Sequence, residues 1–339
     1  MNYMRSHFVA FVVVIVMPLA SEAATLKVPQ QYGSIQAAID AASDGDVIRV
    51  AAGTYSVNLS IEGKALSLIG AGADTTILDG GARDHVILAQ GVPAGAVTIA
   101  GFTIRNGFAG DSDTPSLGGG LLALDAPVIV RDNTFTGNSA CMGLALTVQG
   151  RSVTLLRNKI VANTHPSGCG WEAVALLLEG DSLVDQNVIA DNPASGVLIN
   201  TAAKATVRRN IIRNNTEDPS IAARGWGGLG SSDYLVALVL ENNLFENNSG
   251  SSVGGVFLID AQGGPAIVRN NSFVGNSGPY ASGLMLSQAF YTGFDISSNL
   301  FADDFGVPEI ECGGVSIGKG NVFAAAAAPA LAPGCSFAQ

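Results

Sequence analysis

The chain has 339 residues, of which 47% are hydrophobic, 13% are charged and 42 are glycine. The hydrophobic content excludes a disordered chain, and so much glycine with so little charge excludes a coiled coil or a helical bundle. The formal net charge of -11 argues against nucleic acid as a partner, because an acidic surface repels phosphate backbones.

The first 23 residues have the three parts of a signal peptide. Arg5 precedes an apolar run from Phe8 to Ala20, and the small residues Ser21 and Ala23 occupy positions -3 and -1 of a cleavage site after Ala23. The run is too short to cross a bilayer comfortably, so we expect no membrane span after cleavage; retention as an anchor is the alternative. The mature chain is therefore expected to be secreted or to lie in the periplasm or cell envelope.

A short helix is predicted over residues 34–42, near the start of the mature chain. Ser34 is a suitable N-cap, and Ile35, Ala38, Ile39 and Ala42 form one apolar face. Short strands follow, the first at 47–50, each ending near glycine or aspartate. We expect the helix to cap the open end of a stack of strands.

One pattern, Asn-x-apolar-x-x-Asn after an alternating apolar stretch, recurs through the second half of the chain. Its Asn pairs are Asn133 and Asn138, Asn158 and Asn163, Asn187 and Asn192, Asn210 and Asn215, Asn243 and Asn248, Asn271 and Asn276, and Asn299 with Asp304. The first Asn recurs at intervals of 23 to 33 residues, and glycine followed by alternating apolar residues is interleaved with it. A period of this length indicates a stacked repeat.

Each repeat holds short strands and no helical pattern, so a strand finds its partner only in the next turn, in parallel. This predicts an all-β, single-stranded parallel β-helix of about 10 coils over residues 24–318. A low-complexity tail follows over residues 319–339, and it covers the last coil if a disulfide attaches it there. Asn tolerates the left-handed backbone of sharp corners, and stacked Asn side chains form hydrogen-bonded ladders. We therefore interpret the Asn residues as structural.

The cysteines support this stacking. Cys141 and Cys169 are 28 residues apart, and Cys312 and Cys335 are 23 apart, so each pair is separated by about one coil. Strand spacing lies within the Cα separation that a disulfide allows. We predict the bonds Cys141–Cys169 and Cys312–Cys335, with free thiols as the alternative in a protein that stays reduced.

Three stretches of the chain carry a resemblance to a known family. They are VPQQYGSIQAAIDAASDGDVIRVAAGTY, then LSIEGKALSLIGAGADTTILDG, and VTIAGFTIRNG at 97–107. All three resemble the pectin lyase-like superfamily of secreted proteins. The resemblance covers about residues 25–318 and implies a right-handed parallel β-helix. The superfamily includes pectinesterases, pectate lyases and polygalacturonases, whose catalytic signatures are not found in this sequence. The resemblance therefore implies a scaffold and leaves the activity open.

The segments between the Asn corner and the glycine strand vary most in length, at 108–117, 164–171, 216–234 and 277–282. They occupy one corner of the coil and should stack along one side of the rod. The ligand-binding candidates there are His165, Trp171, Arg224, Trp226, Tyr234 and Tyr280. Sugar rings stack on aromatic faces and hydrogen-bond to charged groups, so this side is expected to bind a polysaccharide or cell-surface glycan.

Acid–base cleavage of a glycan needs two carboxyl groups at a suitable separation. The candidates for this catalytic pair are Asp111 or Asp113 with Glu172 or Asp218. No metal site or cofactor is expected, apart from Ca²⁺ as a weak candidate at the Asp111-Ser-Asp113 spacing. A second acidic cluster, comprising Asp303, Asp304, Glu309 and Glu311, is interpreted as a solvated edge.

Three classes of function remain open on sequence grounds. The first is a polysaccharide lyase or glycoside hydrolase, and the second is a non-catalytic glycan-binding protein. The third is a structural or adhesive surface rod without a small ligand. We favour an exported β-helix with a carbohydrate-related role, and leave open whether it catalyses a reaction.

Overall fold

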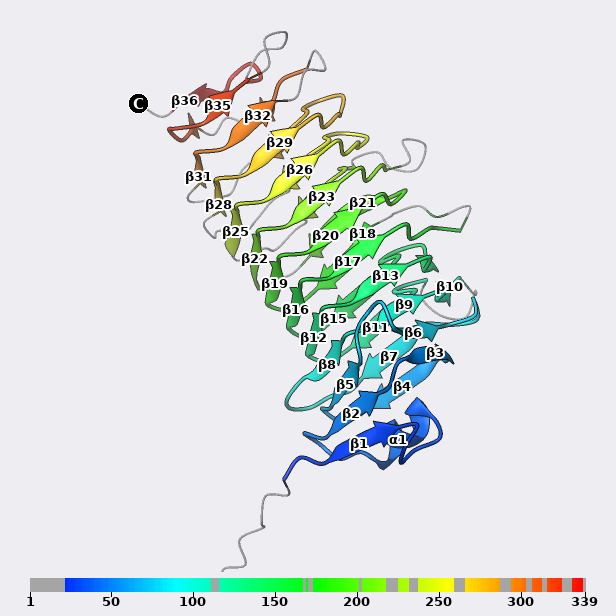
Figure 1. The fold of residues 1–339 in the computed structure, drawn as a ribbon. Coiled ribbons are helices and arrows are strands. Elements are labelled where there is room, and N and C mark those ends of the chain that lie inside the picture. Colours follow the sequence, from blue (N-terminus) through cyan, green and yellow to red (C-terminus); the bar gives the residue numbers. More distant parts are fainter. Residues whose placement is uncertain are drawn as a thin grey trace, which may run out of the picture.

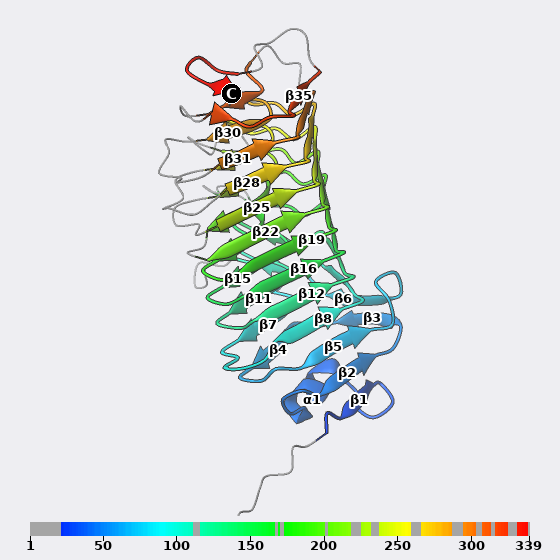
Figure 2. The same ribbon diagram turned by 90° about the vertical axis from the view of Figure 1, so that its left-hand side faces the viewer.

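The computed structural model describes residues 22–110, 116–166, 169, 173–200, 203–217, 225–231, 237–258, 266–286, 294–302, 307–312, 316–324 and 331–337. They form an elongated stack of coils, with the N-terminal strands at one end and the C-terminal strands at the other (Figures 1 and 2). The signal peptide predicted over residues 1–23 lies almost wholly outside the described residues.

Three long parallel sheets run along the stack, and from β2 to β33 each coil contributes one strand to each sheet in the order A, B, C. Sheet A contains β1 (Thr25–Val28), β2 (Val47–Val50), β5 (Ser67–Gly70), β8 (Val97–Ala100), β12 (Val128–Arg131), β16 (Val153–Leu156), β19 (Ser182–Asp185), β22 (Lys204–Arg208), β25 (Ala237–Glu241), β28 (Ala266–Arg269) and β31 (Phe294–Ser297). Sheet B contains β3 (Gly53–Ser56), β6 (Thr76–Asp79), β9 (Thr103–Arg105), β13 (Thr134–Thr136), β17 (Lys159–Val161), β20 (Val188–Ala190), β23 (Ile211–Arg213), β26 (Leu244–Glu246), β29 (Ser272–Val274), β32 (Leu300–Ala302) and β35 (Val322–Phe323).

Sheet C contains β4 (Leu59–Glu62), β7 (Ile87–Gln90), β11 (Leu121–Leu124), β15 (Leu146–Gln149), β18 (Ala173–Leu178), β21 (Ser195–Asn200), β24 (Leu229–Ser231), β27 (Val256–Leu258), β30 (Leu284–Leu286) and β33 (Ile310–Glu311). Two short pairs complete the strands, β10 (Phe108–Ala109) with β14 (Ser139–Ala140), and β34 (Ser316–Ile317) with β36 (Ser336–Phe337). The long sheets have 11, 11 and 10 strands, so the predicted parallel β-helix of about 10 coils is confirmed.

Alternation of burial along each strand separates the core from the surface. In β12, Val128 and Val130 face the interior while Ile129 and Arg131 are half-buried on the outside. The same alternation repeats coil after coil, because each strand pairs in register with its counterpart one coil away. The resulting core is continuous from Leu26 to Ile317.

Aromatic rings stack along the inside of sheet B in its last coils. The rings of Phe245, Phe273, Phe301 and Phe323 have centroids 4.7–5.2 Å apart and are nearly parallel. Phe323 belongs to β35, beyond the predicted end of the β-helix at residue 318. The described parts of 319–339 therefore continue the stack, and Leu331 also forms a bridge with Ile310.

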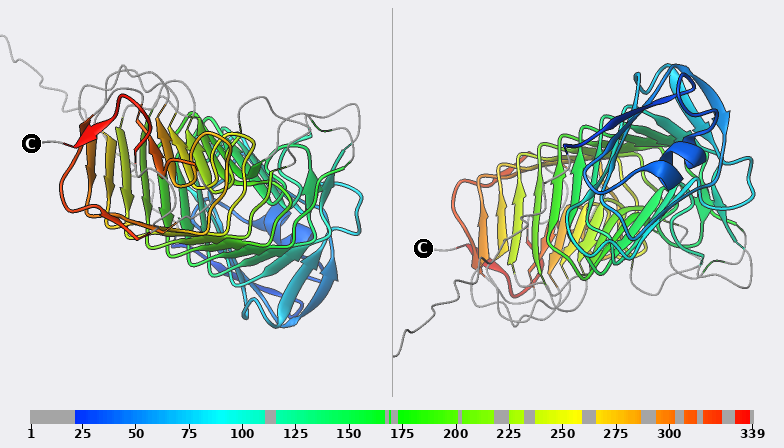
Figure 3. Two further views of the ribbon diagram at one scale, coloured as in Figure 1. Left: turned by 90° about the horizontal axis from the view of Figure 1, so that it is seen from above. Right: turned by 90° about the horizontal axis from the view of Figure 1, so that it is seen from below.

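The predicted capping helix is confirmed as α1 (Ile35–Ala41), which lies across the N-terminal end of the stack (Figure 3). The Ser34 hydroxyl accepts a hydrogen bond from the Ala37 N–H at 3.1 Å, as expected for an N-cap. Ile35, Ala38 and Ile39 are buried against the first coil. The helix thus covers apolar core that an open end would expose to water.

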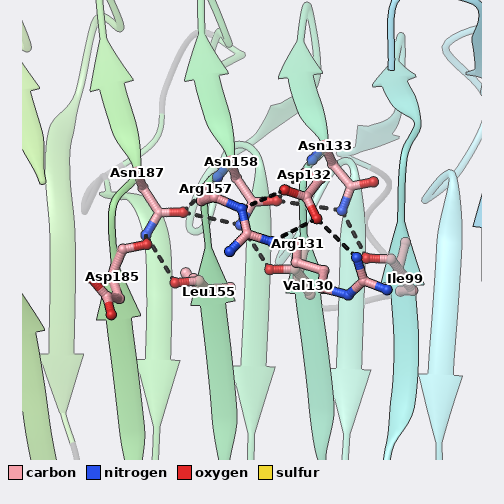
Figure 4. A network of polar contacts seen from close by, with 10 residues as sticks. All are labelled: Ile99, Val130, Arg131, Asp132, Asn133, Leu155, Arg157, Asn158, Asp185 and Asn187. Atoms are coloured by element: carbon pink, nitrogen blue, oxygen red, sulfur yellow. Dashed lines mark hydrogen bonds and ion pairs between the residues drawn. The ribbon is translucent and has the colours of Figure 1, made fainter. Parts of the chain in front are cut away.

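The corner between sheets A and B carries the predicted Asn ladder (Figure 4). Its rungs are Asn133, Asn158, Asn187, Asn210, Asn243, Asn271, Asn299 and Asn321. A second ladder follows sheet B, formed by Asn138, Asn163, Asn192, Asn215, Asn248 and Asn276. All of these side chains except the half-buried Asn321 are buried, which confirms their structural interpretation.

One detail of the corners differs from the prediction. The left-handed residue is the one before each ladder Asn, for example Asp132 with φ 58° and Arg157 with φ 53°. Asn133 and Asn158 instead direct their amide groups along the rod axis. At each corner, one residue therefore adopts the left-handed backbone of the turn, and the Asn that follows it forms the hydrogen bonds of the ladder.

Both predicted disulfides are present. Cys141 and Cys169 are joined with a Cα separation of 5.1 Å, and Cys312 and Cys335 with one of 5.7 Å. Each bond links neighbouring coils, as the spacing of about one coil predicted. The second bond attaches the C-terminal segment to β33.

Candidate ligand-binding side

The connections from sheet B to sheet C, here called the B–C loops, stack on one another along one side of the rod. Thr216 pairs with Ser249, and Ser249 pairs with Ser277, one coil further along. Trp226, Val253 and Ala281 form a second column of parallel bridges. The prediction that these segments line one side is confirmed for their described parts.

The two ends of each loop are fixed by different residues. The second Asn ladder holds the start, since Asn215 Nδ2 donates to Asn248 Oδ1 at 3.1 Å. A column of glycines holds the end, where the chain enters sheet C. A Cβ on Gly255 would lie 2.1 Å from the Gly283 carbonyl oxygen and 2.9 Å from the Phe273 ring. Only glycine fits this close approach between coils.

The outer face of sheet C forms an apolar floor beneath these loops. Leu122, Leu176 and Phe257 point outward from their strands, yet are no more than 4% exposed. Leu117 from one loop packs on Leu122 and Leu176, in a cluster separate from the main core. The loops thus bury part of the floor with their own apolar side chains.

Trp226 was predicted to bind ligand, and its surroundings give it a different role. Its side chain is 3% exposed, and its ring packs on Phe257 with centroids 6.5 Å apart. The indole Nε1–H donates to the Val197 carbonyl oxygen at 3.1 Å. Because both ring faces are buried, Trp226 offers no face to a sugar, and the prediction for this residue is wrong.

Two other candidates lie among the described residues. Tyr280 is 59% exposed, in the loop that follows Asn276. His165 is half-buried, with Nδ1 3.1 Å from the Pro166 carbonyl oxygen. Their loops are four coils apart, roughly 20 Å at the usual strand spacing. The two residues therefore do not share one pocket, although both belong to the loop-lined side.

Most of the predicted site falls outside the described residues. These are the catalytic candidates Asp111, Asp113, Glu172 and Asp218 and the binding candidates Trp171, Arg224 and Tyr234. Strand β24 is Leu229–Ser231, so the sheet C strand of that coil lies within the segment 216–234 that was predicted as one loop.

Two buried carboxylates within the loop stack were not predicted as such. Glu217 is 7% exposed, and its Oε2 accepts a hydrogen bond from the Ser251 N–H at 2.8 Å. Glu309 is 2% exposed and accepts a hydrogen bond from the Ser282 hydroxyl at 3.1 Å. The interpretation of Glu309 as part of a solvated edge is therefore wrong. Both carboxylates serve as acceptors that hold one coil to the next.

Charged residues gather instead at the corner between sheets A and B (Figure 4). Asp132 is paired with Arg131 at 2.9 Å and with Arg157 at 2.7 Å, one coil further along. The Arg157 guanidinium, aided by Arg131, holds the pKa of Asp132 below its usual value against the opposing effect of burial. The pair of Asp132 with Arg157 joins two consecutive coils.

Asp185 repeats this arrangement in a more buried setting. Its side chain is 4% exposed and contacts Arg208 at 3.0 Å and Arg209 at 2.5 Å. Hydrogen bonding from Arg209 is the main cause of the lowered pKa of Asp185, and Arg208 adds to it while burial opposes it. Both arginines belong to the next coil, so this carboxylate also fastens two coils together.

Neither a metal cluster nor a membrane-spanning helix occurs in the part of the chain that the structure describes. No group of three or more His, Cys, Asp or Glu side chains is placed there to hold an ion. Over the same residues, no helix is long and apolar enough to cross a bilayer. The Ca²⁺ prediction concerned Asp111 and Asp113, which are not among these residues.

The sequence and the structure were compared with known families and proteins. Residues 128–301 match the family described as the right handed beta helix region. The chain belongs to this right-handed β-helix family. It is also similar to a crystal structure of a pectin methylesterase mutant in complex with a hexasaccharide, with 13% sequence identity, a TM-score of 0.37 and coverage of 82% of either chain. No curated protein matches the sequence. The family match confirms the right-handed parallel β-helix implied by the sequence resemblance, and membership of this family specifies no reaction.

Proposed function

We propose that the protein binds an extended polysaccharide along the side lined by the B–C loops. The observation that carries this proposal is the stacking of these loops in register, with Thr216, Ser249 and Ser277 in one column. Successive coils advance by about 4.8 Å, close to the length of one sugar residue in an extended chain. Loops repeated at this interval offer similar contacts to successive sugars.

The exposed ring of Tyr280 supplies one contact of the expected kind. An exposed phenol presents an apolar face and a hydroxyl together, which suits the apolar face and the hydroxyl groups of a sugar. The described carboxylates of the loop stack, Glu217 and Glu309, are buried and hydrogen-bonded within the protein. These two carboxylates hold neighbouring coils together. A lyase or hydrolase activity would rest on Asp111 or Asp113 with Glu172 or Asp218.

The two disulfides support export of the protein. Disulfides persist in oxidising compartments and are rare in the cytosol. Together with the signal-peptide pattern of residues 1–23, they favour a secreted protein or one of the periplasm or cell envelope. A polysaccharide of the cell surface or its surroundings is then accessible to the loop-lined side.

The alternative is a structural or adhesive rod without a small ligand. Its specific support is that Leu117 and Trp226 are used for packing on sheet C. Loops that bury their own large side chains add thickness and stability to a rod. The two functions differ in whether any glycan binds in a manner that depends on the exposed loop residues.

A glycan array of neutral and acidic polysaccharides, with degradation assays on the same panel, tests the proposal. We expect binding that weakens about tenfold in Tyr280→Ala. The control is Ile211→Ala, which removes an exposed apolar side chain from sheet B and should leave binding unchanged. Absence of binding and cleavage across the panel would favour the structural rod. Cleavage that disappears in Asp111→Ala or Glu172→Ala would establish catalysis.

A further inference from the structure

A shallow hollow of about 220 Å³ lies on the outside of sheet A, at the N-terminal end of the rod. It is lined by Lys27 and Gln30, by Arg49 to Ala51, and by Ile69 to Ala71. These residues come from or follow β1, β2 and β5, which lie side by side in Figure 2. The hollow is on a different sheet from the B–C loops and is separate from the site proposed above.

Two cationic side chains stand next to each other in this hollow. Lys27 pairs directly with Arg49 in the register of β1 and β2, and Ile69 follows in the register of β5. Both cations are exposed and point outward, since the alternate residues Leu26 and Ile48 are buried. Like charges placed directly opposite each other on neighbouring strands are destabilising.

The pair differs from three arginines on the outer face of sheet A. Arg131, Arg208 and Arg269 each contact a carboxylate on their own or a neighbouring coil. Lys27 and Arg49 have no acidic partner among the described residues, although the whole chain carries a net charge of -11. Two unpaired cations beside a hollow form a favourable setting for an anion of matching size.

We propose that this hollow is an oxyanion-binding site, which takes the carboxylate or sulfate group of an anionic saccharide. The Arg49 guanidinium supplies a planar fork that matches two oxygens of the group, and the Lys27 ammonium supplies a mobile point charge. Gln30 adds an amide donor at the rim. Binding neutralises the repulsion between Lys27 and Arg49, so the free energy of binding includes relief of that repulsion.

The test uses the full mature protein and NMR titration of backbone amides at constant ionic strength, since salt screens exposed charges. The probes are inorganic sulfate and the monosaccharide galacturonate, which separate a free ion from a sugar-borne carboxylate. We expect saturable shifts at residues 27–30, 49–51 and 69–71 with at least one probe. In the variant Lys27→Met with Arg49→Met, the dissociation constant should rise at least tenfold.

The matched control carries Arg83→Met and Arg151→Met. It removes two exposed cations elsewhere and should change the dissociation constant less than twofold. Without ligand, the Lys27→Met, Arg49→Met variant should unfold at the same temperature as the wild type or slightly above it, because like-charge repulsion is removed. Absence of saturable shifts with both probes, or equal weakening in the two double variants, would overturn the proposal. The outcome is independent of glycan binding at the B–C loops, which Tyr280→Ala reports.

Discussion

The side-chain oxygen of Asn158 accepts two hydrogen bonds from Asn133, one coil earlier: one from the backbone N–H at 3.1 Å and one from Nδ2 at 3.4 Å. Asn133 Nδ2 also donates to the Ile99 carbonyl oxygen at 2.8 Å, a further coil back. Each Asn amide thus contacts the coil on either side, and the ladder is a continuous network inside the rod.

Removing one interior rung should lower stability substantially. In Asn187→Ala, the Asn158 N–H and the Leu155 carbonyl lose partners at 2.8 and 2.9 Å while remaining buried. Each unsatisfied group costs about 1–3 kcal/mol, so we expect a loss of about 3 kcal/mol in the free energy of unfolding. Urea unfolding monitored by circular dichroism gives this value. Asn200→Ala, at a half-buried position outside the ladder, is the control and should change it by no more than about 0.5 kcal/mol.

The ion pairs of Asp185 should make stability depend on pH in the acid range. The lowered pKa of this carboxylate in the folded chain means that its contribution is fully present above the unfolded-state pKa of about 3.9. The contribution is lost as the pH falls from there through the folded-state pKa. Asp185→Asn should cost about 1–2 kcal/mol at pH 7, because the arginines are half-exposed and screened.

Melting temperatures of this variant and the wild type, recorded from pH 7 down to pH 2, check this prediction. The two curves should converge at the acid end, where the wild-type carboxylate is protonated. Asp74→Asn, at an exposed position with no ion pair among the described residues, is the control and should follow the wild type throughout. A constant difference between Asp185→Asn and the wild type at every pH would contradict the assigned role of Asp185.

The two disulfides should stabilise different parts of the rod against unfolding. Loss of either bond releases a loop of 23 or 28 residues, which costs about 3 kcal/mol by chain entropy. With Cys312→Ser and Cys335→Ser, the effect should concentrate at the C-terminal end, where the bond holds β33. Hydrogen exchange should then accelerate in Ile310 to Cys312 and in β36, and change little near α1. Peptide mapping of the unreduced protein provides the direct check, and a peptide joining Cys141 to Cys312 would contradict the stacking of coils.

Glycine at position 255 should be irreplaceable. In Gly255→Ala, the new methyl group would meet the Gly283 carbonyl oxygen at 2.1 Å, so two coils have to move apart. Overpacking of this kind costs about 3 kcal/mol, measurable by thermal or urea unfolding. Gly33→Ala provides the comparison, since nothing lies within 4 Å of its Cβ, and it should be nearly neutral. Equal stability of the two variants would show that the coils are less tightly packed than the structure has them.

The repeat in the sequence was sufficient to predict the architecture, because each coil uses the same residue types for the same task. Spacing between equivalent Asn residues gave the register, and the register gave both disulfides. The same logic extends beyond the predicted end at 318. Asn321-Val-Phe323 repeats the pattern of Asn271-Ser-Phe273 and Asn299-Leu-Phe301, and this signal identifies the last coil.

The candidate site was less predictable, because residue type does not tell which way a loop side chain points. Trp226 was selected as an aromatic loop residue, yet its column partners Val253 and Ala281 are both apolar. Alignment of the loops coil by coil would have marked that column as buried. Glu309 is similarly buried, where it lies beside Ser282 of the preceding coil. Pairing between loops is a tertiary property that composition alone does not express.

Because the ladder rungs are equivalent, the rod can be lengthened or shortened by whole coils. Asn242-Asn243 and Asn270-Asn271 are the same dipeptide at the same corner of neighbouring coils. Excision of residues 243–270 would rejoin Asn242 to Asn271 and shorten the rod by about 4.8 Å, with both of its ends intact. Evolution can therefore adjust the reach of such a protein by duplicating or deleting one genetic unit, without redesigning either terminus.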